Sequence, residues 1–292
     1  MIEARGLTKR YGRVVAVDDA SFTVHPGRVT GFLGINGSGK TTTLRALVGL
    51  IRPTSGEVLI DGRPYRALRH PVRHIGAVLE QGVSQPGQSG RAHLTTFALL
   101  AGASEDRVEE LLELVGLTAA ADRRTGGYSL GMRQRLAVAT ALLGNPRVLV
   151  LDEPANGLDP EGIVWLRRLL DGHARRGGTV FISSHQLTEM THLVDDVVII
   201  AAGRILRHAP VAQLAGAESP PLLVRSSDQD RLWHALRASG LRVTAGGTAL
   251  SVLGSDGSTV GRIAFEAGVI IHELTPQPVE LEQVFFNLVG RS

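Results

Sequence analysis

The chain has 292 residues, enough for two domains with hydrophobic cores, and no cysteine, which excludes disulfides and thiolate metal sites. The net charge of +3 is too small to indicate a nucleic-acid partner, although the calculated pI is 9.8. No apolar run reaches the roughly 18 to 20 residues that span a bilayer, and the first residues lack the apolar core of a signal peptide. We therefore expect a cytoplasmic protein without a nucleic-acid partner.

The first part of the chain is predicted to build a phosphate-binding loop. Residues 2–7 and 20–24 alternate like strands, residues 29–33 read as a short buried strand, and residues 41–50 as a helix. Between the last two, the pattern G-x-x-x-x-G-K-[ST] is met by Gly34-Ile35-Asn36-Gly37-Ser38-Gly39-Lys40-Thr41. A strand before this pattern and a helix after it are the context that a nucleotide site requires.

Each residue type in the loop has a physical task. The glycines permit close approach of the backbone, and the N-terminus of the helix offers unpaired N–H groups to an anion. Lys40, one of only two lysines in the chain, is expected to reach the β- and γ-phosphates, and the Thr41 hydroxyl to bind Mg²⁺. We expect nucleotide contacts from Gly34, Asn36, Gly37, Ser38, Gly39, Lys40, Thr41 and Thr42.

The next segment contains a basic run and a predicted helical insertion. The run comprises Arg63, Arg66, Arg69, His70, Arg73 and His74, and it admits two interpretations, solvated surface charges or contact with membrane headgroups. An apolar strand at 75–79 ends in Glu80-Gln81. Helical patterns then dominate from about residue 86 to 144, which predicts an α-rich insertion in a strand–helix fold.

Two further strands end in polar residues. The apolar run 148–151 predicts a central parallel strand, and it is followed by Asp152 and Glu153. An aspartate in this position can hold Mg²⁺, and the adjacent glutamate can orient or deprotonate an attacking water. The strand at 179–182 ends in Ser183-Ser184-His185. Together these features predict phosphoryl transfer, which needs positioning and charge neutralisation more than covalent help.

The chain divides into two predicted domains. We expect an α/β phosphate-loop domain over residues 1–216, with the helical insertion at 86–144, and a small α+β domain over 217–292. The predicted order β-α-β-β-α-β in the second domain, followed by a helix at 279–289, favours a ferredoxin-like module. That module contains no cluster of catalytic residue types. A regulatory or docking role and a purely stabilising role both stay open.

These motifs together resemble the ATPase subunits of ATP-binding cassette (ABC) transporters, over residues from about 5 to 205. The family's signature motif, usually L-S-G-G-Q, is read here as Tyr128-Ser129-Leu130-Gly131-Met132, a variant similar to cassettes of the antibiotic and drug exporters. The resemblance implies that Ser129 and Gly131 address the γ-phosphate, that Asp159 joins two sites across a dimer, and that His185 contacts the γ-phosphate. It assigns catalysis to Glu153, His185 and Lys40. It also favours adenine stacking by Tyr11 over an ordinary surface tyrosine, and it leaves Glu80 and Gln81 as alternatives at the metal and water.

The resemblance carries an activity and partners with it. It implies an Mg²⁺-dependent ATPase that dimerises around ATP, with a second copy of the chain as the expected partner. It further implies a separate transmembrane permease, export of a drug, antibiotic or other small molecule, and a peripheral place on the inner face of the cell membrane. Two alternatives stay open at this stage. One is a soluble cassette ATPase that acts on ribosomes or DNA, and the other is a nucleotide-binding scaffold without hydrolysis.

Overall fold

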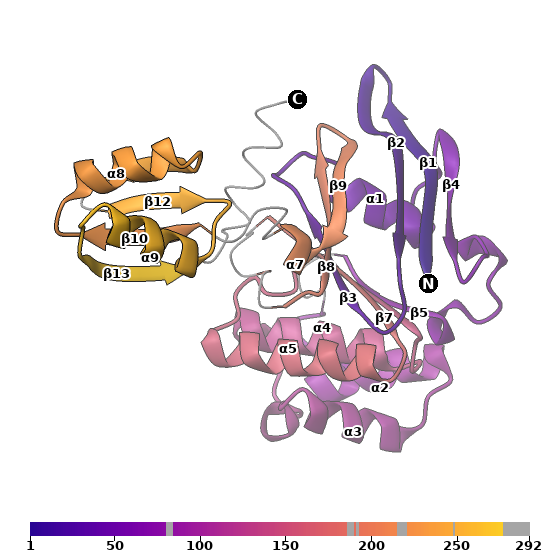
Figure 1. Cartoon of the computed structure of the whole chain (residues 1–292). Coiled ribbons are helices and arrows are strands. Elements are labelled where there is room, and N and C mark those ends of the chain that lie inside the picture. The colour runs from indigo at the N-terminus through magenta and orange to yellow at the C-terminus, as the bar shows by residue number, and fades with distance from the viewer. Residues whose placement is uncertain (80–83, 186–189, 191–192, 215–220, 248, 277–292) are drawn as a thin grey trace. The chain divides into compact units, whose positions relative to one another are not determined.

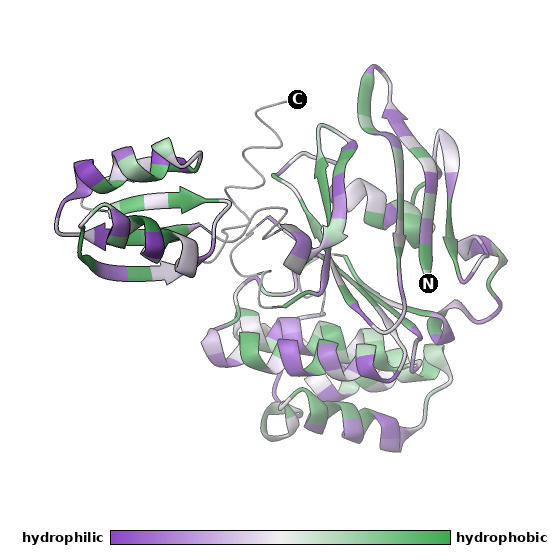
Figure 2. Cartoon of the chain, in the orientation of Figure 1, coloured by the Kyte–Doolittle hydropathy of each residue, from purple (hydrophilic) through white to green (hydrophobic). Residues whose placement is uncertain are grey.

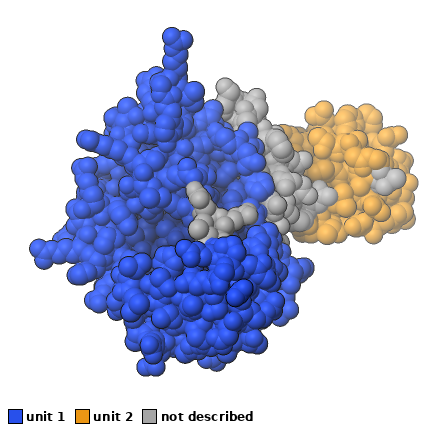
Figure 3. All heavy atoms as spheres, turned by 180° about the vertical axis from the view of Figure 1, so that it is seen from behind, with its two compact units in different colours: residues 1–209 blue, residues 210–292 orange. Residues whose placement is uncertain are grey.

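The computed structural model divides the chain into two compact units, Met1–Ala209 and Pro210–Ser292 (Figure 3). It describes residues 1–79, 84–185, 190, 193–214, 221–247 and 249–276. The boundary therefore falls a few residues before the predicted one at 216. The predicted helix at 279–289 lies outside the described residues.

Unit 1 is built on a six-stranded sheet in the order β5-β6-β7-β3-β8-β9 (Figure 1). The pairs β5–β6, β6–β7, β7–β3 and β3–β8 are parallel. Helices follow β3 and β6, as expected of parallel strands with crossover connections. The strands are β3 (Val29–Leu33), β5 (Ile75–Val78), β6 (Val148–Leu151), β7 (Thr179–Ser184), β8 (Asp196–Ala201) and β9 (Arg204–Pro210).

A three-stranded antiparallel sheet shares a core with the central sheet. Its order is β2-β1-β4, formed by β1 (Ile2–Tyr11), β2 (Val14–Val24) and β4 (Ser55–Ile60). The rings of Phe22, Phe32 and Phe181 pack together from β2, β3 and β7, with centroids 5.1–5.6 Å apart. Each buried aromatic side chain of this kind contributes about 1.5–3 kcal/mol. This contact fixes the antiparallel sheet to the strand that carries the phosphate loop.

The helices of unit 1 cover the sheets and form the insertion. Helix α1 (Lys40–Leu47) contacts β2 and β4, whereas α5 (Pro160–Arg175) packs on β3 and β7. The insertion consists of α2 (Gly90–Ala101), α3 (Glu105–Leu114) and α4 (Leu130–Leu142), which pack on one another. Figure 2 shows apolar residues concentrated on the central strands, while the helices carry mixed faces. Helices α2, α3, α4 and α5 each begin at a serine or aspartate cap, and these caps are, in that order, Ser89, Ser104, Ser129 and Asp159.

Unit 2 is a four-stranded antiparallel sheet with two helices. The sheet order is β11-β12-β10-β13, and the chain order is strand-helix-strand-strand-helix-strand, the order that the sequence predicts. The apolar faces of the helices and of the sheet share one core, in which Val224, Leu232 and Val252 are fully buried. The elements are α7 (Val211–Leu214), β10 (Leu222–Ser226), α8 (Gln229–Ala238), β11 (Arg242–Gly246), β12 (Ala249–Leu253), α9 (Gly257–Glu266) and β13 (Ile271–Pro276).

Candidate nucleotide site

The phosphate loop of residues 34–39 connects the buried end of β3 to the start of α1. Two of its glycines are required by close approaches of other backbone. A Cβ on Gly34 would lie 2.5 Å from the Ile200 carbonyl oxygen, and one on Gly39, at φ +107°, would lie 2.5 Å from the Ala16 carbonyl oxygen. Real Cβ atoms do not tolerate such distances, so the loop conformation depends on these glycines.

Lys40 is buried within the loop. Its Nζ donates to the carbonyl oxygens of Gly34 at 2.5 Å and Ile35 at 3.2 Å, and the residue is only 6% exposed. Burial lowers the pKa of Lys40, and the nearby carboxylates of Glu153 and Asp152 oppose that shift. A phosphate that enters the loop would therefore replace these neutral carbonyl oxygens as the hydrogen-bond partner of the Lys40 ammonium and would bring a negative charge to it.

The loop has unsatisfied groups that fit a phosphate. Ser38 Oγ is buried without a hydrogen-bond partner in the described part of the chain. A Cβ on Gly37 would have no described atom within 4 Å, so its outer side is open. The first turn of α1 lacks intrahelical acceptors for its N–H groups. Orphaned donors around an open space match the chemistry of a polyphosphate.

Thr41 and Asp152 meet beside the loop, as a magnesium site requires. Thr41 Oγ1 donates to Asp152 Oδ2 at 3.0 Å, although the two residues are 111 positions apart. Among the described residues, no group of three or more His, Cys, Asp or Glu side chains could hold a metal. The Thr41–Asp152 pair fits Mg²⁺, which commonly takes one or two protein ligands and completes its shell with phosphate oxygens and water.

Glu153 lies between two cationic or protonatable side chains. Its Oε1 is 3.9 Å from Lys40 Nζ, and its Oε2 is 2.9 Å from His185 Nδ1. Its backbone has φ +51°, a left-handed conformation that is uncommon outside glycine. Such backbone conformations cluster at functional sites, because the surrounding structure must enforce them.

Ser183 is a site residue that the motifs did not single out. Its hydroxyl donates to Asp152 Oδ1 and accepts a 3.0 Å hydrogen bond from the backbone N–H of Glu153. It lies on β7, whose parallel pairing with β6 carries both strands to the same edge of the sheet. The available sequence signal was a serine that directly follows the apolar run 179–182, two residues before His185, and the structure buries it fully.

The signature residues form a second, separate cluster. Ser129, Gly131, Gly157 and Asp159 line a hollow of about 260 Å³ whose lining includes no residue of the phosphate loop. The substitution of leucine for the family's first glycine has a visible consequence, since a Cβ on Gly157 would lie 2.1 Å from Leu130 Cδ2. The Leu130 side chain thus covers the Gly157 backbone, while Ser129 is exposed and Gly131 is half-buried.

The remaining expected residues lie at the end of β1, in the phosphate loop and the start of α1, or outside the described residues. Tyr11 ends β1 and is 49% exposed, and Lys9 Nζ lies 4.9 Å from the centroid of its ring. Asn36 is exposed in the loop, and Thr42 is partly buried in the first turn of α1. Glu80 and Gln81 lie outside the described residues.

A parallel sheet with a phosphate loop, a threonine–aspartate pair and a strand-end glutamate defines a phosphate-loop nucleotide hydrolase. Comparison with known proteins narrows this class. The family model described as ABC transporter matches residues 17–156, and a model described as a domain of unknown function matches residues 220–282.

Two relatives and one solved structure illustrate the similarity. The bacitracin transport ATP-binding protein BcrA of Bacillus licheniformis is 38% identical, over 99% of this chain and 97% of its own length. The lantibiotic transport ATP-binding protein SrtF of Streptococcus pyogenes is 36% identical, over 70% of this chain and 89% of its own. The dimeric structure of MJ0796, a bacterial ABC transporter cassette, has a TM-score of 0.66 at 25% identity, over 72% of this chain and 99% of that one.

The chain belongs to the ATP-binding proteins of the ABC transporter family. The predicted family and the phosphate-loop cassette fold are therefore confirmed, as is the ATPase class of the protein. The relatives are transporter subunits, which disfavours the alternative of a cassette that acts on ribosomes or DNA. Within the described ranges, none of the helices has the length and apolar character needed to cross a bilayer.

Proposed function

We propose that this protein is the ATP-hydrolysing motor of an exporter, and that two copies close around two ATP molecules to drive a separate transmembrane permease. The observation that carries the proposal is the placement of Glu153 between Lys40 and His185, next to the Thr41–Asp152 pair. The names of the relatives support an antibiotic or another small molecule as the exported substrate.

In this proposal the phosphate loop binds the β- and γ-phosphates through its N–H groups and Lys40. Thr41 and Asp152 would hold Mg²⁺, which neutralises phosphate charge when bound. Glu80 or Gln81 would add a ligand for the metal or the water. Because Lys40 and Asp152 are both buried, their charges act on the nucleotide with little screening by solvent.

Glu153 is the proposed general base. Its carboxylate would take the proton of the attacking water, while the hydrogen bond to His185 fixes the orientation of the carboxylate. The imidazole of His185 is then placed to contact the γ-phosphate. Two strand ends, those of β6 and β7, thus supply the base and its orienting partner.

The separation of Ser129, Gly131 and Asp159 from the phosphate loop supports a dimer. A second copy, placed head to tail, would offer these residues to ATP held on the first copy. Ser129 begins α4, so the N–H groups of that helix add a favourable field for phosphate. Tyr11, with its exposed ring, would stack on adenine.

An apolar groove of unit 1 is the proposed docking surface for the permease. It encloses about 360 Å³ between the end of α1, β5, α2 and α4, and its lining includes Leu50 and Phe97, which are 68% and 41% exposed. Large apolar side chains gathered at such a hollow usually mark a protein interface. A permease seated there would keep this subunit at the inner face of the cell membrane.

Nucleotide trapping by Glu153→Gln tests the proposal. The variant should bind ATP, lose about 10²- to 10⁴-fold in turnover, and accumulate as an ATP-dependent dimer in size-exclusion chromatography. Lys40→Ala is the control, since it should lose both ATP binding and dimerisation. Wild-type turnover in Glu153→Gln would remove Glu153 as the base, and a monomer with bound ATP would remove the dimer.

A further inference from the structure

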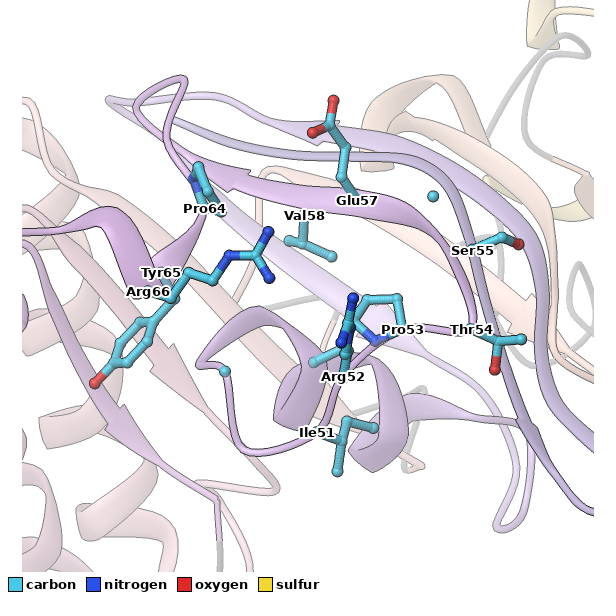
Figure 4. A pocket seen from close by; sticks show the side chains of 13 residues that line it. Ile51, Arg52, Pro53, Thr54, Ser55, Glu57, Val58, Pro64, Tyr65 and Arg66 are labelled. Carbon is cyan, nitrogen blue, oxygen red and sulfur yellow. The ribbon is translucent and has the colours of Figure 1, made fainter.

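A further pocket of unit 1 contains none of the candidate nucleotide-site residues (Figure 4). It encloses about 410 Å³, a size typical of small-ligand sites. Its lining comes from the end of α1, the following residues 51–54, strand β4 and the turn η1 (Tyr65–Ala67). The pocket therefore lies between the C-terminal end of α1 and strand β4 of the antiparallel sheet.

The apolar part of the lining is continuous with the core. Ile51 and Tyr65 pack against the main hydrophobic cluster, and Val58 belongs to it. The ring of Tyr65 lies against the backbone of Gly49, where a Cβ would be 2.8 Å from Tyr65 Cδ1. These contacts leave an apolar surface of Ile51, Pro53 and Val58 facing the pocket.

Hydrogen bonds hold the backbone that carries Arg52. Lys9 Nζ donates to the Arg52 carbonyl oxygen at 2.8 Å, and the Thr54 N–H donates to the Thr8 carbonyl oxygen at 2.8 Å. The Arg10 N–H also donates to Thr54 Oγ1 at 3.0 Å. These hydrogen bonds hold residues 52–54 against β1, and so they fix the backbone position from which the Arg52 side chain extends at the rim of the pocket.

Arg66 is fixed in a comparable way from the other side. It lies in the single turn η1 that begins after Pro64, where the Ala67 N–H donates to the Pro64 carbonyl oxygen at 2.8 Å. Figure 4 shows the side chains of Arg52 and Arg66 extending into the space around Val58, while the Glu57 carboxylate points away from them.

The two guanidinium groups have no counter-charge in the described part of the chain. Neither has a hydrogen bond or ion pair with a described residue, and Glu57, the acidic residue of the lining, lies 3.6 Å from Arg5 instead. Two cations that share a pocket repel each other, and an oxyanion that accepts from both removes that repulsion. Guanidinium groups match the oxygen geometry of phosphate particularly well.

We propose that this pocket binds a phosphate-type oxyanion between Arg52 and Arg66, with the apolar body of the ligand resting on Pro53 and Val58. Arg66 belongs to the basic run of residues 63–74, for which the sequence allowed either solvated surface charges or contact with membrane headgroups. It is the member of that run that lines the pocket. The ligand is a phospholipid headgroup or a free organophosphate, which share this chemistry. The lipid source rests on the proposed docking groove, because Leu50 of that groove lies between pocket residues Gly49 and Ile51.

Vesicle binding tests the lipid source. The full chain, saturated with Mg²⁺ and ADP so that the phosphate loop is filled, is mixed with phosphatidylcholine vesicles with or without phosphatidylglycerol. We expect flotation only with phosphatidylglycerol, weakening with salt. The Arg52→Gln/Arg66→Gln double variant should bind at least about tenfold more weakly, as loss of charge-assisted hydrogen bonds implies.

The matched control removes the same charge outside the pocket. Arg63 and Arg69 are exposed residues of the same basic run that do not line it. The Arg63→Gln/Arg69→Gln double variant should keep vesicle binding within about twofold, because general attraction to a surface contributes only a small part at moderate salt. An equal loss in both double variants would overturn the pocket in favour of diffuse charge.

Calorimetric titration with glycerol 1-phosphate and with inorganic phosphate tests the soluble source on the same ADP-saturated samples. Saturable binding that is lost in Arg52→Gln/Arg66→Gln and kept in Arg63→Gln/Arg69→Gln supports the pocket with a free organophosphate. If neither vesicles nor soluble phosphates distinguish the two double variants, the proposal is wrong. The affinity for ADP is measured alongside and should be equal in all three proteins. A wild-type protein that does not bind ADP would contradict the proposed nucleotide site and leave the pocket proposal untouched.

Discussion

The hydroxyl of Ser183 receives a 3.0 Å hydrogen bond from the backbone N–H of Glu153. The same hydroxyl donates to Asp152 Oδ1, so one side chain on β7 determines the position of both acidic residues at the end of β6. Glu153 has φ +51°, and the hydrogen bond to its N–H is one of the contacts that hold this unfavourable conformation. Ser183 is therefore a positioning residue for the proposed base.

Replacement of Ser183 by alanine should impair turnover more than nucleotide affinity. The change removes a hydrogen bond to a charged group and leaves a buried N–H without its acceptor, which costs about 1–3 kcal/mol. We expect kcat to fall about tenfold to a hundredfold, with a small change in KM, in a steady-state ATPase assay. Ser183→Thr keeps the hydroxyl and suits a strand, so it should restore most of the rate. Equal activity of Ser183→Ala and wild type would contradict the positioning role.

The phosphate loop and the strand-end acids could be predicted from sequence because their signals are local. The signals for the loop are the buried strand β3, the glycine spacing and the amphipathic start of α1, and all of them lie within residues 29–47. A place for His185 at the site beside Glu153 followed from the family resemblance, and the parallel pairing of β6 and β7 brings the two together. The role of Ser183 over Ser184 did not, because it depends on a one-residue register, here Leu151 beside Ile182.

Other features depend on long-range packing that a single sequence does not encode locally. The three phenylalanines 22, 32 and 181 come from distant strands, and their shared contact follows only from the sheet order β7-β3 and the position of β2. The contact of the Leu130 side chain with the Gly157 backbone could not be predicted either, because Gly157 lies in a different segment of the chain, the one before α5. The pairing of Arg52 with Arg66 around one pocket likewise required the fold.

Complementation between two inactive variants should reveal the shared site. In the proposed dimer, Lys40→Ala should lack phosphate binding, and Ser129→Asp should place a negative charge toward the partner's nucleotide while keeping an acceptor that caps α4. Each protein alone should be inactive. A mixture should regain ATPase activity, because the mixed dimer contains one intact Lys40 opposite one intact Ser129.

The measurement is ATPase rate as a function of mixing ratio at constant total protein. Activity should be highest near equal amounts, where mixed dimers are most abundant. Ser129→Asp should still bind ATP with near wild-type affinity when monomeric, since Ser129 does not line the phosphate loop. Absence of activity at every ratio would argue against a head-to-tail composite site.

A charge in the apolar groove should separate transport from nucleotide binding. Phe97→Asp introduces a carboxylate beside Leu50 at the proposed permease interface, and an unpaired charge in such an interface costs several kcal/mol. We expect loss of the permease from affinity-purified membranes and unchanged ATP binding. Val164→Asp, at a 48% exposed position of α5 outside the groove, is the control and should keep the permease bound. The groove is not the interface if both variants retain the permease.

Stability should fall in mild acid because of a buried histidine in unit 1. His93 is 4% exposed and lies 3.2 Å from Thr140 Oγ1, and its burial lowers its pKa below the ordinary value of 6.5. Above pH 6.5 the ring is neutral in both states and contributes no pH dependence. Below it the unfolded chain takes up a proton that the folded chain resists, so the free energy of unfolding decreases until the pH passes the lowered folded-state pKa. Thermal unfolding between pH 7.5 and 5.5 should thus show a falling Tm, and His93→Gln, which keeps a hydrogen-bonding group near Thr140, should flatten that slope. An unchanged slope in His93→Gln would assign the acid sensitivity to other groups, of which His173, also buried and with a lowered pKa, is the next to replace.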